Sequence, residues 1–147
     1  MALSDVEKLV EKEGIEFFLC SFVEMGGLPK AKLVPATHLR DMAADGAGFA
    51  GFASGNMGQG PHSPDMANMP DFDSLMVVPW RPNMAWVAGN IVVDGRPYPY
   101  CPRTILQWQL DRAAELGYTL NVGVEPEFML LKKDEDGTYR PSDPHDI

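Results

Sequence analysis

The 147-residue chain lacks several features that mark specialised classes of protein. It has two cysteines, Cys20 and Cys101, and no Cys-x-x-Cys pair, which excludes a disulfide framework and predicts two reduced, structural thiols. No stretch approaches the ~20 apolar residues that span a bilayer, and the charged N-terminus lacks the apolar core of a signal peptide. The sequence therefore predicts a cytoplasmic protein with no membrane contact.

Basic residues are also scarce. The chain has 12 lysines and arginines against 21 aspartates and glutamates, for a formal net charge of -9. A surface of this sign repels a phosphate backbone, and no basic stripe offsets it, so no nucleic-acid partner is expected. The lysine-containing glycine loop of P-loop ATPases and the Gly-x-Ser-x-Gly nucleophile motif are absent as well.

The first third of the chain alternates helical and strand patterns. Ser4 and Glu7 have the spacing of a capping box, which predicts a helix over residues 4–14 that is closed by a glycine. Two apolar runs within residues 15–34, joined by a glycine-containing turn, predict a β-hairpin. A short helix is expected over residues 37–44.

Residues 46–70 differ from the rest in composition. They are rich in glycine, proline and methionine and have few aliphatic runs, which predicts a long loop without regular structure. Such loops are uncommon in compact domains and are often functional, although a merely flexible insertion is the alternative. The segment also contains apolar side chains that need a surface to pack on: Phe49, Phe52, Met57, Met66 and Met69.

A second hairpin is expected after this loop. Residues 74–78 and 84–93 have strand patterns, and Asp94-Gly95 is a strong hairpin turn before a short strand over residues 96–98. The first ~100 residues can therefore form a small mixed sheet with a helix packed against it, in the α+β class.

The last segment begins a second unit. A helix with an apolar stripe is expected to begin at Pro102 and to end at Gly117. A long strand is expected over residues 118–131, and it needs partner strands that this chain does not provide. The pattern therefore predicts that the chain is part of something larger.

Two glutamates in this expected strand are candidate metal ligands. Because side chains alternate across a strand, Glu125 and Glu127 share one face, about 6.5–7 Å apart. Their like charges repel, so a divalent cation cluster that takes carboxylate oxygens is one explanation. A solvent-facing acidic pair is the other, and two carboxylates are too few for a complete site. Pro126 marks an edge, a bulge or a strand end, as is common at active-site rims.

Four segments in order resemble the glutamine synthetase family. They are Asp65 to Asp71, Val77 to Pro82, Asp94 to Arg103 and Gly123 to Phe128. The resemblance implies a β-grasp N-terminal domain over residues 1–100, followed over residues 101–147 by the first helix and strand of the catalytic domain.

The resemblance also implies an activity. Members of the family join ammonia to the side-chain carboxylate of glutamate through a γ-glutamyl phosphate, using ATP and Mg²⁺ or Mn²⁺, and make glutamine. By position, Glu127 is expected to ligate the metal on the glutamate side, and Glu125 the metal at the nucleotide phosphates. The nucleotide-binding residues cannot be assigned from this chain.

The family assembles as two stacked hexameric rings, and residues 46–70 are expected to cover the catalytic site of a neighbouring subunit. Bacterial members carry an aspartate in this loop that binds ammonium, whereas residues 51–57 contain no acid here. The loop is more similar to a branch, type III, that includes glutamate–methylamine ligases, so a ligase making γ-glutamylmethylamide is an alternative. For either amine, Asp65 and Asp71 are the candidates for the amine-site carboxylate.

The family's remaining metal, ATP and glutamate ligands are not among these residues. We therefore expect an incomplete catalyst, active only with a complementary C-terminal part. A non-catalytic ring or regulatory subunit with the same fold is the remaining alternative.

Overall fold

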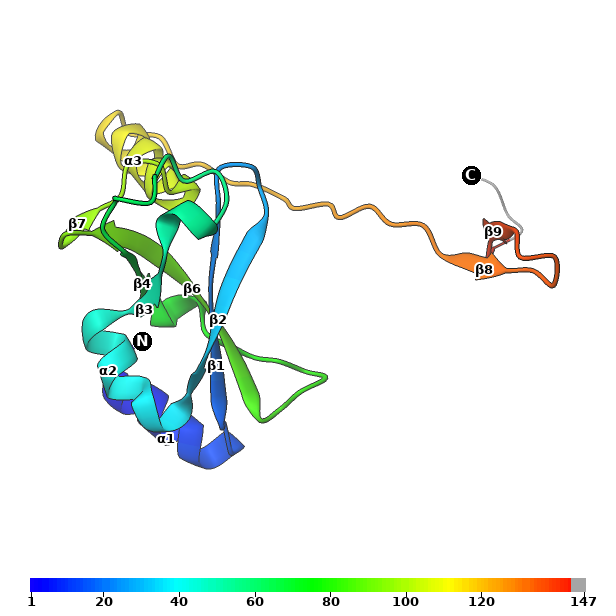
Figure 1. The fold of residues 1–147 in the computed structure, drawn as a ribbon, viewed down its shortest axis with the longest axis horizontal. Coiled ribbons are helices and arrows are strands. Elements are labelled where there is room, and N and C mark those ends of the chain that lie inside the picture. Colours follow the sequence, from blue (N-terminus) through cyan, green and yellow to red (C-terminus); the bar gives the residue numbers. More distant parts are fainter. Residues whose placement is uncertain (144–147) are drawn as a thin grey trace.

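The computed structural model describes residues 1–143, and a mixed β-sheet lies at its centre (Figure 1). The helices and strands are α1 (Leu3–Glu13), β1 (Phe17–Val23), β2 (Pro29–Pro35), α2 (Leu39–Asp45), β3 (Ala47–Phe49), β4 (Met66–Pro70), β5 (Met76–Val77), β6 (Met84–Val93), β7 (Arg96–Pro97), α3 (Pro102–Glu115), β8 (Leu131–Lys133) and β9 (Tyr139–Pro141). Short 3₁₀ turns are η1 (Ala36–His38), η2 (Gly51–Ala53) and η3 (Phe72–Ser74).

Strand β6 is the central strand of the sheet. The strand order is β2-β1-β6-β4-β3, and β5 and β7 also pair with β6. Strand β1 runs parallel to β6, and the other pairings are antiparallel. Burial alternates along most of β6, as expected for a strand whose two faces meet different surroundings.

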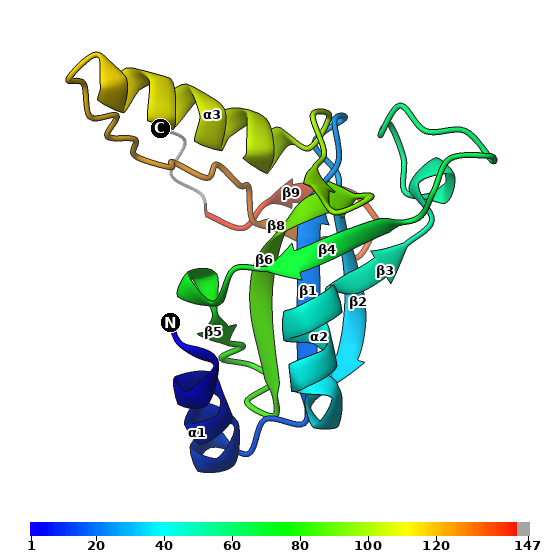
Figure 2. The ribbon, with the colours of Figure 1, turned by 90° about the vertical axis from the view of Figure 1, so that its left-hand side faces the viewer.

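Helices α1 and α2 cover one face of this sheet (Figure 2). The apolar side chains on that face form a core: Val6, Ile15, Phe18, Cys20, Leu39, Met42, Ala47, Ala85 and Val87. A second cluster lies nearer to α3 and consists of Phe22, Met57, Met66, Ile91 and Cys101. The predicted α+β class is confirmed, and both cysteines are buried and free. None of the helices within residues 1–143 is long and apolar enough to cross a bilayer.

Helix α1 ends as predicted but starts differently. Gly14 takes the left-handed conformation, with φ 65°, at the C-cap. The predicted capping box is wrong, because Ala2 is the N-cap and Ser4 lies within the helix. The earlier start lets Leu3 pack against the core, and burying this side chain outweighs the side-chain cap.

The prediction of a loop without regular structure over residues 46–70 is wrong at both ends of this range, where the chain forms strands. Strands β3 and β4 lie inside it and pair with each other, and β4 also pairs with β6. These strands contain as many small or polar residues as bulky apolar ones, and their pattern does not predict a strand, so they form through pairing with the sheet. The loop proper therefore spans residues 50–65.

The strand predicted over residues 118–131 is also wrong for residues 118–130, which form neither strand nor helix. They run away from the sheet as an extended segment, and only Leu131 enters a strand, β8 (Figure 1). Val124 and Phe128 are 86% and 81% exposed. The segment has no neighbouring strand within the described residues, and a strand needs such a partner for its backbone hydrogen bonds.

Candidate functional site

Glu125 and Glu127 lie together on the extended segment that follows α3. Both are exposed, and neither forms a hydrogen bond or an ion pair with any residue of the described part of the chain. Their carboxylate oxygens are therefore available as ligands, and oxygen donors of this kind suit Mg²⁺ or Mn²⁺. Within residues 1–143 no group of three or more acidic, histidine or cysteine side chains gathers around a common point, so the pair supplies only part of a metal site.

Asp65 and Asp71, the two predicted amine-site acids, have different surroundings. Asp65 is exposed and lies directly before β4. Asp71 is half-buried and caps η3, where its Oδ1 accepts a hydrogen bond from the backbone N–H of Asp73 at 3.0 Å. The structure brings neither acid together with the two glutamates of the extended segment within a cluster of ionisable groups.

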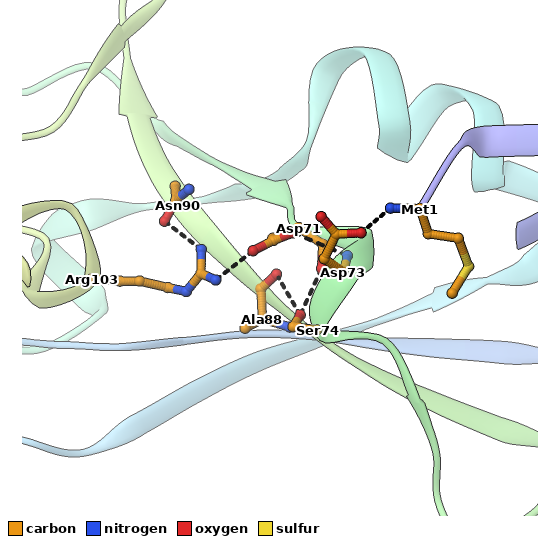
Figure 3. Close-up of polar contacts among 7 residues, drawn as sticks. All are labelled: Met1, Asp71, Asp73, Ser74, Ala88, Asn90 and Arg103. Carbon is orange, nitrogen blue, oxygen red and sulfur yellow. Dashed lines mark hydrogen bonds and ion pairs between the residues drawn. The ribbon is translucent and has the colours of Figure 1, made fainter. Parts of the chain in front are cut away.

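The other oxygen of Asp71 belongs to an ion pair. Its Oδ2 lies 2.5 Å from Nη2 of Arg103, and Nη1 of Arg103 donates to Oδ1 of Asn90 at 2.8 Å (Figure 3). The hydrogen bond from Arg103 is the main reason that the pKa of Asp71 is lowered. The sequence did not indicate this pair, because 32 residues separate its members.

A local break in the sheet positions Asp71. Between β4 and β5 the chain leaves the sheet and forms η3, so no strand residue pairs with Ala88 on this side of β6. Two other hydrogen bonds satisfy the backbone N–H and carbonyl of Ala88. The backbone N–H of Asp71 donates to the carbonyl of Ala88 at 2.8 Å, and the backbone N–H of Ala88 donates to the hydroxyl of Ser74 at 2.9 Å (Figure 3). These two hydrogen bonds fix the backbone around Asp71 at the interruption between the β4 and β5 pairings, and with it the position of the Asp71 carboxylate.

Glu24 is a functional candidate that the sequence analysis missed. Its side chain is 1% exposed and accepts three hydrogen bonds of 2.9 Å, from the backbone N–H groups of Gly26, Leu28 and Asn56. It therefore ties the loop over residues 50–65 to the β1–β2 turn. The signal in the sequence was an acid directly after an apolar strand and before Met25-Gly26-Gly27.

The loop is held at a second point as well. Met57 is completely buried, and its carbonyl accepts a hydrogen bond of 2.5 Å from the hydroxyl of Tyr98. Met57 and Met66 thus pack in the core of their own chain, and a neighbouring subunit is not needed to explain them. Phe52, which is 56% exposed, remains available on the outside of the loop.

Glu24 gives the loop a testable dependence on pH. The three backbone N–H groups lower the pKa of its carboxyl group. A depressed carboxyl pKa contributes stability that is complete above the ordinary value of about 4.3 and is lost as the pH falls through the lower value. We therefore expect the NMR signal of the Asn56 amide to stay constant from pH 7 to about 5 and to move only in more acidic solution.

Glu24→Gln should abolish that acid transition and loosen the loop already at pH 7, because the amide presents N–H groups to N–H donors. Glu11→Gln, which changes an exposed acid on α1, is the matched control and should keep the wild-type profile. An unchanged profile in Glu24→Gln would show that this carboxylate does not hold the loop.

An apolar groove of about 570 Å³ lies on the sheet face opposite α1 and α2. It is lined by Leu19, Met76, Val78, Trp80, Arg81, Met84 and Trp86. None of the predicted site residues lines it, and Arg81 is the one charged side chain in its walls, so the groove is separate from the candidate metal ligands.

Known proteins resemble the chain over most of its length. Residues 99–146 match the family "Glutamine synthetase, catalytic domain". A glutamine synthetase of Rhizobium leguminosarum bv. phaseoli is 40% identical over 130 residues, which are 88% of this chain and 30% of that protein. A glutamate–methylamine ligase of Methyloversatilis universalis is 38% identical over 147 residues, 99% of this chain and 33% of the relative.

Solved structures show the same relationship. The structure named "GmaS/ADP complex-Conformation 1" superposes with a TM-score of 0.72 at 44% identity, covering 74% of this chain and 25% of that chain. "Apo GmaS without ligand" gives a TM-score of 0.71 at 44% identity. The chain spans about a third of the length of the curated relatives named above. On these matches, the chain belongs to the glutamine synthetase family.

Proposed function

We propose that this protein takes part in the ATP-dependent joining of ammonia to the side-chain carboxylate of glutamate, with glutamine as the product. The observation that carries the proposal is the pair Glu125 and Glu127. Their two carboxylates are exposed and unpaired, and they lie within the segment that matches the family's catalytic domain.

In the proposed reaction the glutamate carboxylate accepts the γ-phosphoryl group of ATP, and ADP leaves. The amine nitrogen then attacks the resulting acyl phosphate, the bond to the phosphate oxygen breaks, and inorganic phosphate departs as the nitrogen loses a proton. Glu125 and Glu127 would hold divalent cations, Glu125 near the nucleotide and Glu127 near glutamate. Such cations neutralise phosphate charge during phosphoryl transfer.

We propose that the loop over residues 50–65 forms the part of the site that covers the reacting groups. The loop over residues 50–65 is fixed on its sheet by Glu24 and Tyr98, so it can present Phe52 and its exposed backbone as a rigid surface. A rigid cover excludes water from a reactive acyl phosphate and limits hydrolysis. We propose that this cover faces the glutamates of a neighbouring copy in a ring of identical subunits, two hexamers forming a dodecamer.

Methylamine is the second candidate donor. Residues 51–57 carry no acid to bind and deprotonate ammonium, and the exposed Phe52 suits an alkyl group better than an ion. The similarity to a glutamate–methylamine ligase extends over 99% of the chain. The product would then be γ-glutamylmethylamide.

Steady-state kinetics of the protein in its native assembly test the proposal. ADP release with ATP and Mg²⁺ should require glutamate and an amine together. A kcat/KM at least about tenfold higher for ammonia than for methylamine, equivalent to about 1.4 kcal/mol, identifies ammonia as the donor. The reverse ratio identifies methylamine. If neither amine supports glutamate-dependent ADP release, the ligase proposal is wrong and a non-catalytic ring subunit becomes the better explanation.

A further inference from the structure

Arg103 joins helix α3 to strand β6 and to the 3₁₀ turn η3. It lies in the first turn of α3, and its guanidinium group reaches Asn90 on β6 with one nitrogen and Asp71, the N-cap of η3, with another (Figure 3). A guanidinium group is a rigid planar fork, so two contacts made by its separate arms restrict its orientation more than a single contact would. We call Asp71, Asn90 and Arg103 the Arg103 latch.

The acceptor side of the latch is fixed by the sheet. Asp71 is held by its backbone N–H to the carbonyl of Ala88 and by its Oδ1 to the N–H of Asp73. Asn90 is only two residues beyond Ala88 on the same strand, β6. The positions of both acceptors, Asp71 and Asn90, therefore do not depend on the direction of α3. The position of Arg103 does depend on it, because Arg103 lies on α3.

Helix α3 has little other attachment within the described residues. Cys101 and Thr104 at its start are buried, with 0% and 5% exposure. Beyond them Leu106 is 52% exposed, and Leu116, the C-cap, is 68% exposed, whereas Ile105 and Leu110 are half-buried. The latch is thus the polar part of a small contact near the start of the helix, which also includes Gln107 and Trp108 where they share a hollow with Val92 of β6.

A contact at one end of a helix controls the position of the other end. Helix α3 has 14 residues, which corresponds to a length of about 21 Å at 1.5 Å per residue. A rotation of about 10° at the latch would displace the far end by about 4 Å. The segment with Glu125 and Glu127 starts at that end, where Tyr118 and Leu120 lie beside Leu110 of the helix, so a shift of the helix end moves the point from which the segment departs. Reacting groups need placement to within about 1 Å.

We propose that the Arg103 latch sets the direction of α3, and with it the placement of Glu125 and Glu127, relative to the sheet that carries the loop over residues 50–65. Asp71 and Arg103 are then positioning residues. This role differs from the amine-binding role predicted for Asp71, and both oxygens of that carboxylate are already engaged by the protein. The catalytic consequence rests on the proposed function, whereas the structural consequence does not.

Distances between spin labels measure the direction of α3 without any assay of activity. One label is placed on α1 with Lys8→Cys and one at the end of α3 with Glu115→Cys. Both native cysteines are buried, so the label reacts at the introduced sites. Labelled protein is diluted with unlabelled protein in its native assembly, so that only distances within one chain are read. A second pair, Lys8→Cys with Leu33→Cys, reports on the α1–sheet unit alone.

Arg103→Gln should at least double the width of the Lys8–Glu115 distance distribution, and Arg103→Lys should have an intermediate effect because it keeps the charge but loses the fork. The Lys8–Leu33 distance should not change, which shows that the variants remain folded. Arg112→Gln removes the same charge from an exposed site on the same helix and should match the wild type. If Arg103→Gln also matches the wild type, the latch does not direct α3.

Kinetics then separate the two roles of Asp71. If Asp71 acts through the latch, Asp71→Asn and Arg103→Gln should lower kcat by a similar factor, about tenfold or more, with little change in the KM for the amine. If Asp71 binds the amine, Asp71→Asn should raise that KM while Arg103→Gln leaves it unchanged, and this result would overturn the positioning role. The distance measurements stand even if the proposed ligase activity is wrong.

Discussion

Glu125→Gln and Glu127→Gln are each expected to lower kcat for glutamate-dependent ADP release by about 10²–10³-fold. Each substitution keeps the shape of the side chain but removes the negative charge that would hold a divalent cation. In phosphoryl transfer the protein acts mainly by positioning groups and by stabilising charge, so the loss of one such group falls on the chemical step. The KM for the amine should change much less.

The two glutamates are also expected to differ from each other. By the assignment to the two metals, Glu125→Gln should weaken the affinity for the nucleotide, and Glu127→Gln should raise the KM for glutamate. Titration with Mn²⁺, followed by its electron paramagnetic resonance signal, measures the metal directly. Each variant should bind Mn²⁺ more weakly, and the double variant should lose at least one binding event.

Glu135→Gln is the matched control for this experiment. Glu135 is exposed in the turn that joins β8 and β9, only eight residues beyond Glu127, and its substitution makes the same change in charge. It should retain wild-type kinetics and Mn²⁺ binding. Retention of full Mn²⁺ affinity after neutralisation of both Glu125 and Glu127 would refute their assignment as ligands.

Local signals in the sequence sufficed for the elements that local chemistry determines. Asp94-Gly95 was predicted as a tight turn, and Asp94 is the only non-glycine residue with positive φ within residues 1–143, at 49°. Pro102 at the start of α3 and Gly14 at the end of α1 were likewise predicted and are confirmed. Each residue has a strong conformational preference of its own, so tertiary contacts do not have to be known.

Elements that depend on distant partners could not be predicted in this way. Strand β4 contains Asn68, which has no strand preference, and it exists because β3 and β6 pair with it on either side. The reverse error occurred at residues 118–130, where a clear alternation predicted a strand but no neighbouring strand is present within the described residues. Strand propensity can be estimated from one segment alone, whereas a strand forms only where a second segment pairs with it.

The candidate site shows the same division. The spacing of Glu125 and Glu127 is visible in the sequence because the two residues are neighbours. Two further contacts each join residues that are 32 positions apart in the sequence, and no local pattern indicates them: Glu24 with Asn56, and Asp71 with Arg103. Consequently the sequence indicated which groups could take part in chemistry but not which groups fix the loop and α3 in place.

Gly89→Ala is expected to lower the free energy of unfolding by about 2–3 kcal/mol. Gly89 lies at the middle of β6, where it pairs with Pro70 of β4. A Cβ atom added there would overlap Oδ1 of Asn68 and would lie 2.7 Å from the backbone oxygen of Met69. Asn68 is completely buried and its Nδ2 donates to Sγ of Cys20 at 3.4 Å, so it has no free space to move into.

Urea denaturation measures this effect, with Gly48→Ala as the control. Gly48 is also a strand glycine, on β3, but a Cβ atom added there meets nothing within 4 Å. Its substitution should change the free energy of unfolding by no more than about 0.5 kcal/mol. Equal effects of the two substitutions would mean that β4 adapts without cost, and that the close approach at Gly89 is unimportant.

The same variant connects the packing of the sheet to the Arg103 latch. Relief of the overlap at Gly89 requires β4 to move away from β6, because the backbone of β4 is itself one of the obstructing groups. Asp71 follows β4 directly, so its carboxylate would move relative to Arg103 and Asn90. Gly89→Ala should therefore broaden the distance distribution between α1 and the end of α3, as Arg103→Gln does, although it removes no charge. If Gly89→Ala destabilises the chain but leaves that distribution narrow, the acceptor side of the latch does not depend on the position of β4.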